Sequence, residues 1–141
     1  MVGVLISLAL FHWITGFMFV ASLNFFILWA GFFQRHENKN LHARMMATGI
    51  LSDLSLVLIL EFQRDAVATA LAHQLSALNQ AHIYCSTVAT LLYLPLIYFG
   101  LKLLRGQDRA KILPLHRKLG YLALTFRTLG YFLMFSMLLK K

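Results

Sequence analysis

The chain has 141 residues, of which 60% are hydrophobic and 13% are charged. A soluble domain carries about twice that charged share, so the composition excludes an ordinary soluble fold and predicts one domain, residues 1–141, in a lipid bilayer. The formal net charge of +8 does not indicate nucleic-acid binding, because the basic residues lie between apolar runs, where they orient the chain and contact lipid headgroups.

Four apolar segments are long enough to cross a bilayer, at about residues 4–33, 43–60, 81–104 and 115–139. We therefore expect an all-α fold, an integral membrane four-helix bundle. The first segment lacks a basic start and exceeds a signal-peptide core, so we expect it to be retained. The segment 61–80 is either an interfacial helix or an early start of the third span, because it has apolar residues at helical spacing: Val67, Leu71, Leu75 and Leu78.

The basic residues are distributed unequally between the two sides of these spans. Three lie on one side, Arg64, Lys140 and Lys141, and nine lie on the other: Arg35, Lys39, Arg44, Lys102, Arg105, Arg109, Lys111, Arg117 and Lys118. The positive-inside rule then predicts that both termini lie outside, which is the periplasm for a protein of the bacterial inner membrane. The loops 34–42 and 102–114 would face the cytoplasm.

The two halves of the chain are weakly similar, as two repeated helical hairpins. The second span opens with LHAR at 41–44 and the fourth with LHRK at 115–118, and eleven residues beyond each histidine stands a charge, Asp53 or Arg127. A parallel repeat about the membrane normal would give this pattern. Two amphipathic helix starts can also resemble each other by chance.

Asp53 and Arg127 both fall about 15–17 Å from the cytoplasmic ends of their spans at the helical rise per residue, close to the bilayer midplane. Neither charge can face lipid cheaply, so we expect an intramembrane ion pair with Asn24 and Tyr93 at similar depth as hydrogen-bond partners. Such a pair either fixes the register of the helices or serves as a proton relay or a partner for a haem propionate.

Four histidines fall in two level pairs. His12 and His82 lie near the periplasmic face, and His42 and His116 near the opposite face. Two imidazoles at one depth on different helices are what a six-coordinate haem iron requires. We expect one haem b between His12 and His82, and a second haem or a metal ion between His42 and His116. Small residues nearby could leave room for the macrocycle: Gly16, Ser86, Ala89, Gly120 and Ala123.

Two other interpretations of these histidines remain open. An isolated histidine near a helix end is often merely interfacial, since a polar ring costs little there. Met45 and Met46 stand beside His42, so these side chains could bind copper instead of haem, although methionine at helical positions usually serves packing.

The chain has a single cysteine, Cys85, and no common catalytic motif. We therefore expect an electron carrier or an assembly factor rather than an enzyme.

The sequence resembles the YozB/CtaM-like family of small bacterial membrane proteins over about residues 38–138. The similarity lies in LHARMMA at 41–47, AHI at 81–83, LPL at 94–96 and HRKL at 116–119. It implies a four-helix membrane bundle with functional histidines His42, His82 and His116, in a family linked in some members to haem-copper oxidase maturation. Glu61 stands where family members tend to have a histidine, and FRTLGY at 126–131 replaces their usual last-span pattern, so we take His12 as the fourth ligand.

The leading functional hypothesis is a haem-binding protein of the respiratory chain that acts in electron transfer or haem handling. The alternatives are an oxidase-assembly factor that binds copper or no cofactor, and a structural subunit of a membrane complex. Besides the lipid bilayer, the candidate partners are respiratory oxidase subunits, a quinone and a second copy of the chain.

Overall fold

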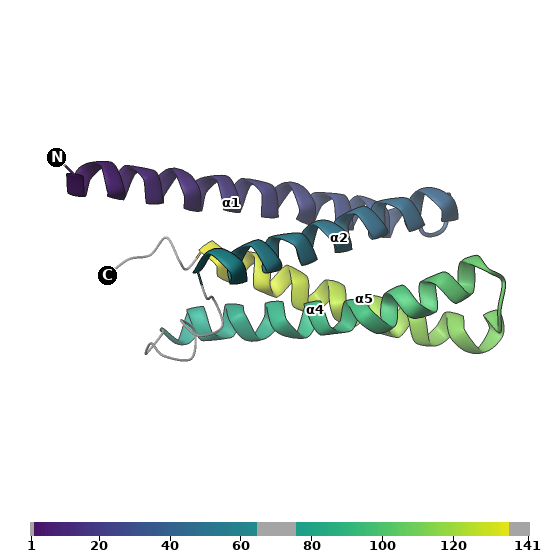
Figure 1. The fold of residues 1–141 in the computed structure, drawn as a ribbon. Helices are drawn as coiled ribbons and strands as arrows, with labels where there is room; N and C mark the ends of the chain where they lie inside the picture. Colours follow the sequence, from purple (N-terminus) through teal and green to yellow (C-terminus); the bar gives the residue numbers. More distant parts are fainter. Residues whose placement is uncertain (1, 65–75, 136–141) are drawn as a thin grey trace.

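The computed structural model describes the backbone of residues 2–64 and 76–135, and the side chains of residues 15–62 and 76–135. This part of the chain consists of four α-helices and contains no strand: α1 (Val2–Phe33), α2 (Lys39–Arg64), α4 (Ala77–Leu104) and α5 (Arg109–Met134) (Figure 1). The prediction of an all-α fold is confirmed. Leu78 belongs to α4, as an early start of the third span requires, whereas Val67, Leu71 and Leu75 lie outside the described residues.

Short polar side chains mark where two of the helices begin. The side chain of Asn38 accepts a hydrogen bond from the backbone N–H of Leu41, and Ser76 accepts one from the N–H of Asn79. Each satisfies a donor that the first turn of a helix leaves unpaired. Between α4 and α5 the chain reverses through Gly106, whose φ of 71° is accessible to glycine without strain.

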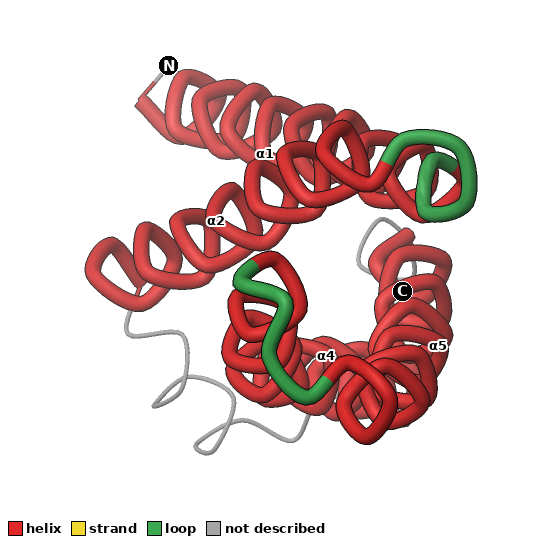
Figure 2. The backbone as a smooth tube through the Cα atoms, turned by 90° about the vertical axis from the view of Figure 1, so that its right-hand side faces the viewer, coloured by secondary structure: helices red, strands yellow, loops and turns green. Residues whose placement is uncertain are grey.

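The helices form two antiparallel hairpins, α1–α2 and α4–α5, whose connecting turns lie at the same end of the molecule (Figure 1). We call this the loop end. The two hairpins meet through α1 against α5 and through α2 against α4. Viewed along the helices, α2 and α5 therefore lie diagonally opposite each other (Figure 2). The loops at 34–42 and 102–114, which the basic residues predict to share one side, do lie at the same end.

Glycines allow close approach within the hairpins. A Cβ atom at Gly49 would lie 2.5 Å from Cδ2 of the buried Leu28, and one at Gly31 would lie 2.9 Å from Cβ of Met45. Such contacts need a residue without a side chain, as in many membrane helix pairs. The main apolar cluster draws on all four helices, with Leu28, Ile50, Tyr93, Leu96, Ala123 and Leu124.

Three helices are long and apolar enough to cross a membrane, over Thr15–Phe33, Lys39–Phe62 and Ala77–Leu104. The described part of α5 is not among them, and it carries Arg117, Lys118 and Arg127. Large apolar side chains face outward, including Phe26, Leu94 and Phe132, each more than 60% exposed. An outer surface of this kind is compatible with a membrane protein.

Candidate functional site

One polar residue from each helix meets in the middle of the molecule. Asn24, Asp53, Tyr93 and Arg127 are all buried, with at most 9% of each residue exposed. Nε of Arg127 donates to Oδ2 of Asp53 at 2.6 Å, and Nη2 donates to Oδ1 at 2.8 Å. The ion pair expected from the sequence is therefore present, with the bidentate geometry that favours arginine with a carboxylate.

The two other members of this central cluster also donate to Asp53. The hydroxyl of Tyr93 lies 2.6 Å from Oδ2, and Nδ2 of Asn24 bonds Oδ1 as well as the carbonyl of Gly49 at 3.0 Å. The carboxylate of Asp53 thus accepts four hydrogen bonds, about as many as its two oxygens can take. Because no acceptor site remains open on Asp53, the arrangement favours a role in fixing helix register over a proton relay.

His42 and His116 both lie toward the loop end, on the diagonal helices α2 and α5. Nδ1 of His42 is 2.7 Å from the carbonyl oxygen of Gly31. A carbonyl can only accept, so Nδ1 carries the proton and Nε2 of a neutral ring keeps its lone pair. Nδ1 of His116 is buried without a hydrogen-bond partner among the described residues.

His82 has the same kind of hydrogen bond as His42. Its Nδ1 lies 2.7 Å from the carbonyl oxygen of Gly130 on α5, and the residue is half-buried. Its Nε2 is therefore also the nitrogen free to bind a metal. His12 belongs to α1, but its side chain lies outside the described side chains, so the facing of His12 and His82 stays a prediction.

Each described histidine within the helices lies against a glycine of the other helix in its hairpin, a relationship that sequence reasoning missed. His42 bonds the carbonyl of Gly31, His82 bonds that of Gly130, and Cε1 of His116 would lie 3.5 Å from a Cβ at Gly100. A glycine leaves its carbonyl open to a neighbouring side chain. Histidine paired with glycine on the adjacent span is thus the sequence signal for this arrangement.

The small residues expected to leave room for a macrocycle divide into two groups. A Cβ at Gly16 would meet no described atom within 4 Å, and one at Gly120 only Cδ2 of Leu96 at 3.9 Å. Ala89 and Ala123 are instead fully packed in the interior, with 1% and 3% exposed, and Ser86 lies against Gly130. Gly16 is exposed, so the open space beside it lies on the outer surface of α1, and of these five residues Gly120 alone leaves room one turn from a described histidine, His116.

Among the described residues, no three histidine, cysteine or acidic side chains lie close enough together to hold a metal ion. A bis-imidazole haem needs two protein ligands, so the pairs described above are the relevant geometry. Met46 adds a soft donor near one pair, since its Sδ would lie 3.2 Å from a Cβ at Gly31.

No family model, curated protein or solved structure matches this chain. The similarity to the YozB/CtaM-like family therefore stays a hypothesis based on the quoted motifs.

Proposed function

We propose that this chain is a four-span bundle of the bacterial inner membrane that binds haem b through histidines at the two ends of the bundle. One pair would be His12 with His82, and a second site would lie between His42 and His116. The fourth span would be α5, whose arginine at the midplane is neutralised by Asp53. Both termini would lie in the periplasm, because the basic residues gather at the loop end.

The observation that carries this proposal is the fixed tautomer of two of the histidines. His42 and His82 each donate Nδ1–H to a backbone carbonyl on the neighbouring helix, at 2.7 Å. Iron-binding and other metal-binding histidines commonly have such a partner, which holds the ring and leaves Nε2 as a basic ligand.

A second observation concerns His116. Its Nδ1 is buried and lacks a partner in the described part of the chain, which costs free energy unless another group binds the ring. Coordination of the iron by Nδ1 itself, rather than by Nε2, would give this atom a partner. The haem iron would supply one-electron chemistry, and the protein residues would hold the two imidazoles and exclude water. Both electron transfer and haem handling would use the histidines that hold the haem.

The spectrum of the purified protein tests the proposal. Low-spin iron with two imidazole ligands gives a sharp α-band on reduction, and a pyridine haemochrome assay identifies haem b. Purified protein that contains no haem, and binds none when haemin is added in detergent, would overturn the proposal.

Copper binding by an oxidase-assembly factor is the second candidate, and one contact favours it. Met46 Sδ packs at Gly31, whose carbonyl bonds His42, so a thioether and an imidazole lie in one region, as copper(I) sites prefer. Metal analysis distinguishes the candidates, since this site would bind copper without a haem spectrum and would lose it on Met46→Leu.

A further inference from the structure

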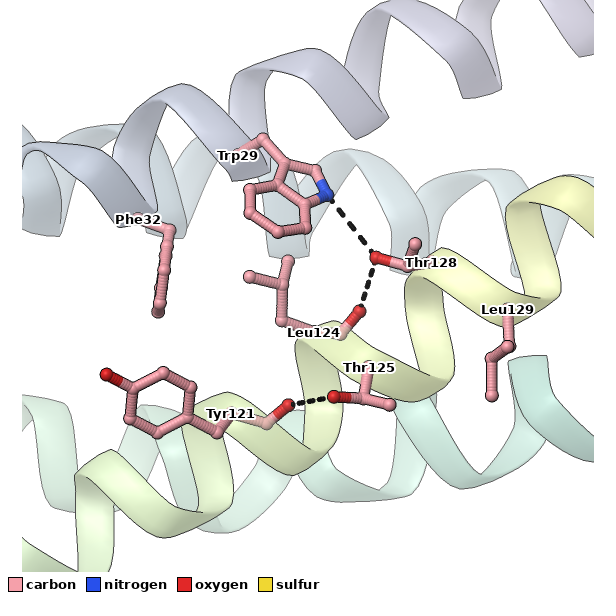
Figure 3. Close-up of a pocket in the computed structure, with 7 residues that line it drawn as sticks. All are labelled: Trp29, Phe32, Tyr121, Leu124, Thr125, Thr128 and Leu129. Atoms are coloured by element: carbon pink, nitrogen blue, oxygen red, sulfur yellow. Dashed lines mark hydrogen bonds between the residues drawn. The ribbon is translucent and has the colours of Figure 1, made fainter.

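A groove runs along the outside of the molecule between α1 and α5, apart from the histidines and the central cluster. Trp29, Phe32 and Tyr121 form its aromatic wall, and the surface of α5 as far as Leu129 forms the rest (Figure 3). Its volume is about 270 Å³. The groove begins at the loop end and runs inward along α5 for about 12 Å, at the helical rise per residue.

The interior of the groove suits a hydrocarbon chain. The hydroxyl of Thr125 donates to the carbonyl of Tyr121 at 2.8 Å, and that of Thr128 donates to the carbonyl of Leu124 at 2.7 Å. The indole N–H of Trp29 is used in turn on the Thr128 hydroxyl, at 3.3 Å (Figure 3). With these donors occupied, the O–H of Tyr121 at the mouth of the groove is the lining donor left for a carbonyl group of a quinone.

The mouth of the groove carries a positive charge that the protein holds in place. Nη1 of Arg35 donates to the carbonyl of Phe32 at 2.9 Å, and Nη2 donates to the hydroxyl of Tyr121 at 3.4 Å. The guanidinium also lies 3.8 Å from the centre of the Phe32 ring. A guanidinium has five N–H donors, so most of them stay available after these two bonds.

Nothing in the described part of the chain neutralises Arg35. The ion pair present there joins Arg127 to Asp53, and no carboxylate lies within 4.0 Å of the Arg35 guanidinium. Arg35 also belongs to the side with nine of the basic residues, where headgroups would surround it. A fixed cation at the mouth of an apolar groove is complementary to an anionic head joined to a hydrocarbon tail.

We propose that this groove is a binding site for one anionic phospholipid, with an acyl chain along Trp29 and α5 and the phosphate at Arg35. The site does not depend on haem or copper, so it stands or falls separately from the proposed function. Arg35 confers the preference for negative charge, and the aromatic wall holds the chain.

The test compares lipids of opposite headgroup type on the purified, delipidated full-length protein. Phosphatidylglycerol should raise the melting temperature more than phosphatidylcholine with the same acyl chains, and should stay bound in native mass spectrometry. Arg35→Gln should remove the difference between the two lipids. Arg44→Gln removes a charge from an exposed position on α2 that does not line the groove, and it should leave the preference intact.

A second variant tests the groove itself. Thr125→Phe places a ring in the groove from an exposed position of α5 and should reduce retention of both lipids several-fold. The proposal is overturned if the unchanged protein does not prefer phosphatidylglycerol, if Arg35→Gln keeps the preference, or if the molecule that Thr125→Phe displaces is an isoprenoid quinone.

Discussion

Asp53 and Arg127 stand 74 positions apart in the chain and form a bidentate pair, with N–O distances of 2.6 and 2.8 Å. Asp53 belongs to the first hairpin and Arg127 to the second, so the pair joins two halves that otherwise meet over limited surfaces. Tyr93 and Asn24 complete the link from the remaining two helices. The central cluster thus connects every described helix through one carboxylate.

Removing one member of this pair should be more damaging than removing both. Arg127→Leu or Asp53→Leu alone leaves an uncompensated buried charge and should cost about 3–5 kcal/mol of unfolding free energy, while the double variant should recover part of that loss. Reversible unfolding in mixed micelles measures the three values. Strictly additive losses would mean that the two side chains do not interact.

Tyr93→Phe should also destabilise the protein, by about 1.5–3 kcal/mol, because the lost hydroxyl donates to a charged acceptor in the interior. Tyr84→Phe is the matched control on the same helix, since Tyr84 is 65% exposed. The same unfolding assay applies. Equal stabilities of the two variants would contradict a contribution from the Tyr93 hydroxyl.

Gly49→Ala should weaken the contact between α1 and α2. The added Cβ would lie 2.5 Å from Cδ2 of Leu28, and Leu28 is 1% exposed, so the helices must separate at a cost of about 1–3 kcal/mol. Gly16→Ala adds the same atom where nothing lies within 4 Å and should be neutral or slightly stabilising. An unchanged unfolding free energy in Gly49→Ala would show that α1 and α2 lie farther apart at this position than the structure has them.

The haem ligands can be tested one at a time. If the proposed haem is present, His82→Ala and His12→Ala should each abolish its α-band, because six-coordinate iron needs both imidazoles. His42→Ala or His116→Ala should remove only a second spectral component, if two haems are bound. His73→Ala is the control, because the sequence places His73 in the segment 61–80 between two spans and in neither histidine pair. An unchanged spectrum in the His82 and His12 variants would show that the ligands lie elsewhere.

The orientation in the membrane predicts the location of the C-terminus. Alkaline phosphatase fused after Lys141 should be active, since the positive-inside rule predicts that the loop end, with its nine basic residues, faces the cytoplasm. A fluorescent protein fused at the same site should be dark if it is exported unfolded. The reverse result would exchange the two faces of the molecule.

The sequence alone predicted the central pair because the physical constraint there is severe. Asp53 and Arg127 are isolated charges at one depth, and each has only the other as a strong partner, so helical rise was enough to bring them together. Asn24 and Tyr93 followed from the same count. The four helices also followed from length and hydrophobicity, although α5 carries more charge than the composition of a span usually allows.

Contacts that depend on side-chain rotation could not be predicted in this way. Which backbone carbonyl accepts the hydrogen bond of His42 or His82 depends on how closely the two helices approach each other. The sequence does not give that distance. The contacts of Arg35 could not be predicted from the sequence either. It lies beyond the end of α1, and the chain there turns so that the guanidinium reaches Phe32 and Tyr121. Depths estimated from the rise per residue of straight helices do not include this turn.

Ribosomes complete the first hairpin before the second exists. The newly made α1–α2 unit therefore carries Asp53 without Arg127, and a lone α4–α5 unit would carry the arginine without its carboxylate. In a bilayer, each hairpin would carry an unpaired charge that the other hairpin neutralises. This matters because an unpaired charge in hydrocarbon is costly. Separately expressed hairpins should consequently find each other in the membrane, and an orphaned half should be the preferred target of membrane proteolysis.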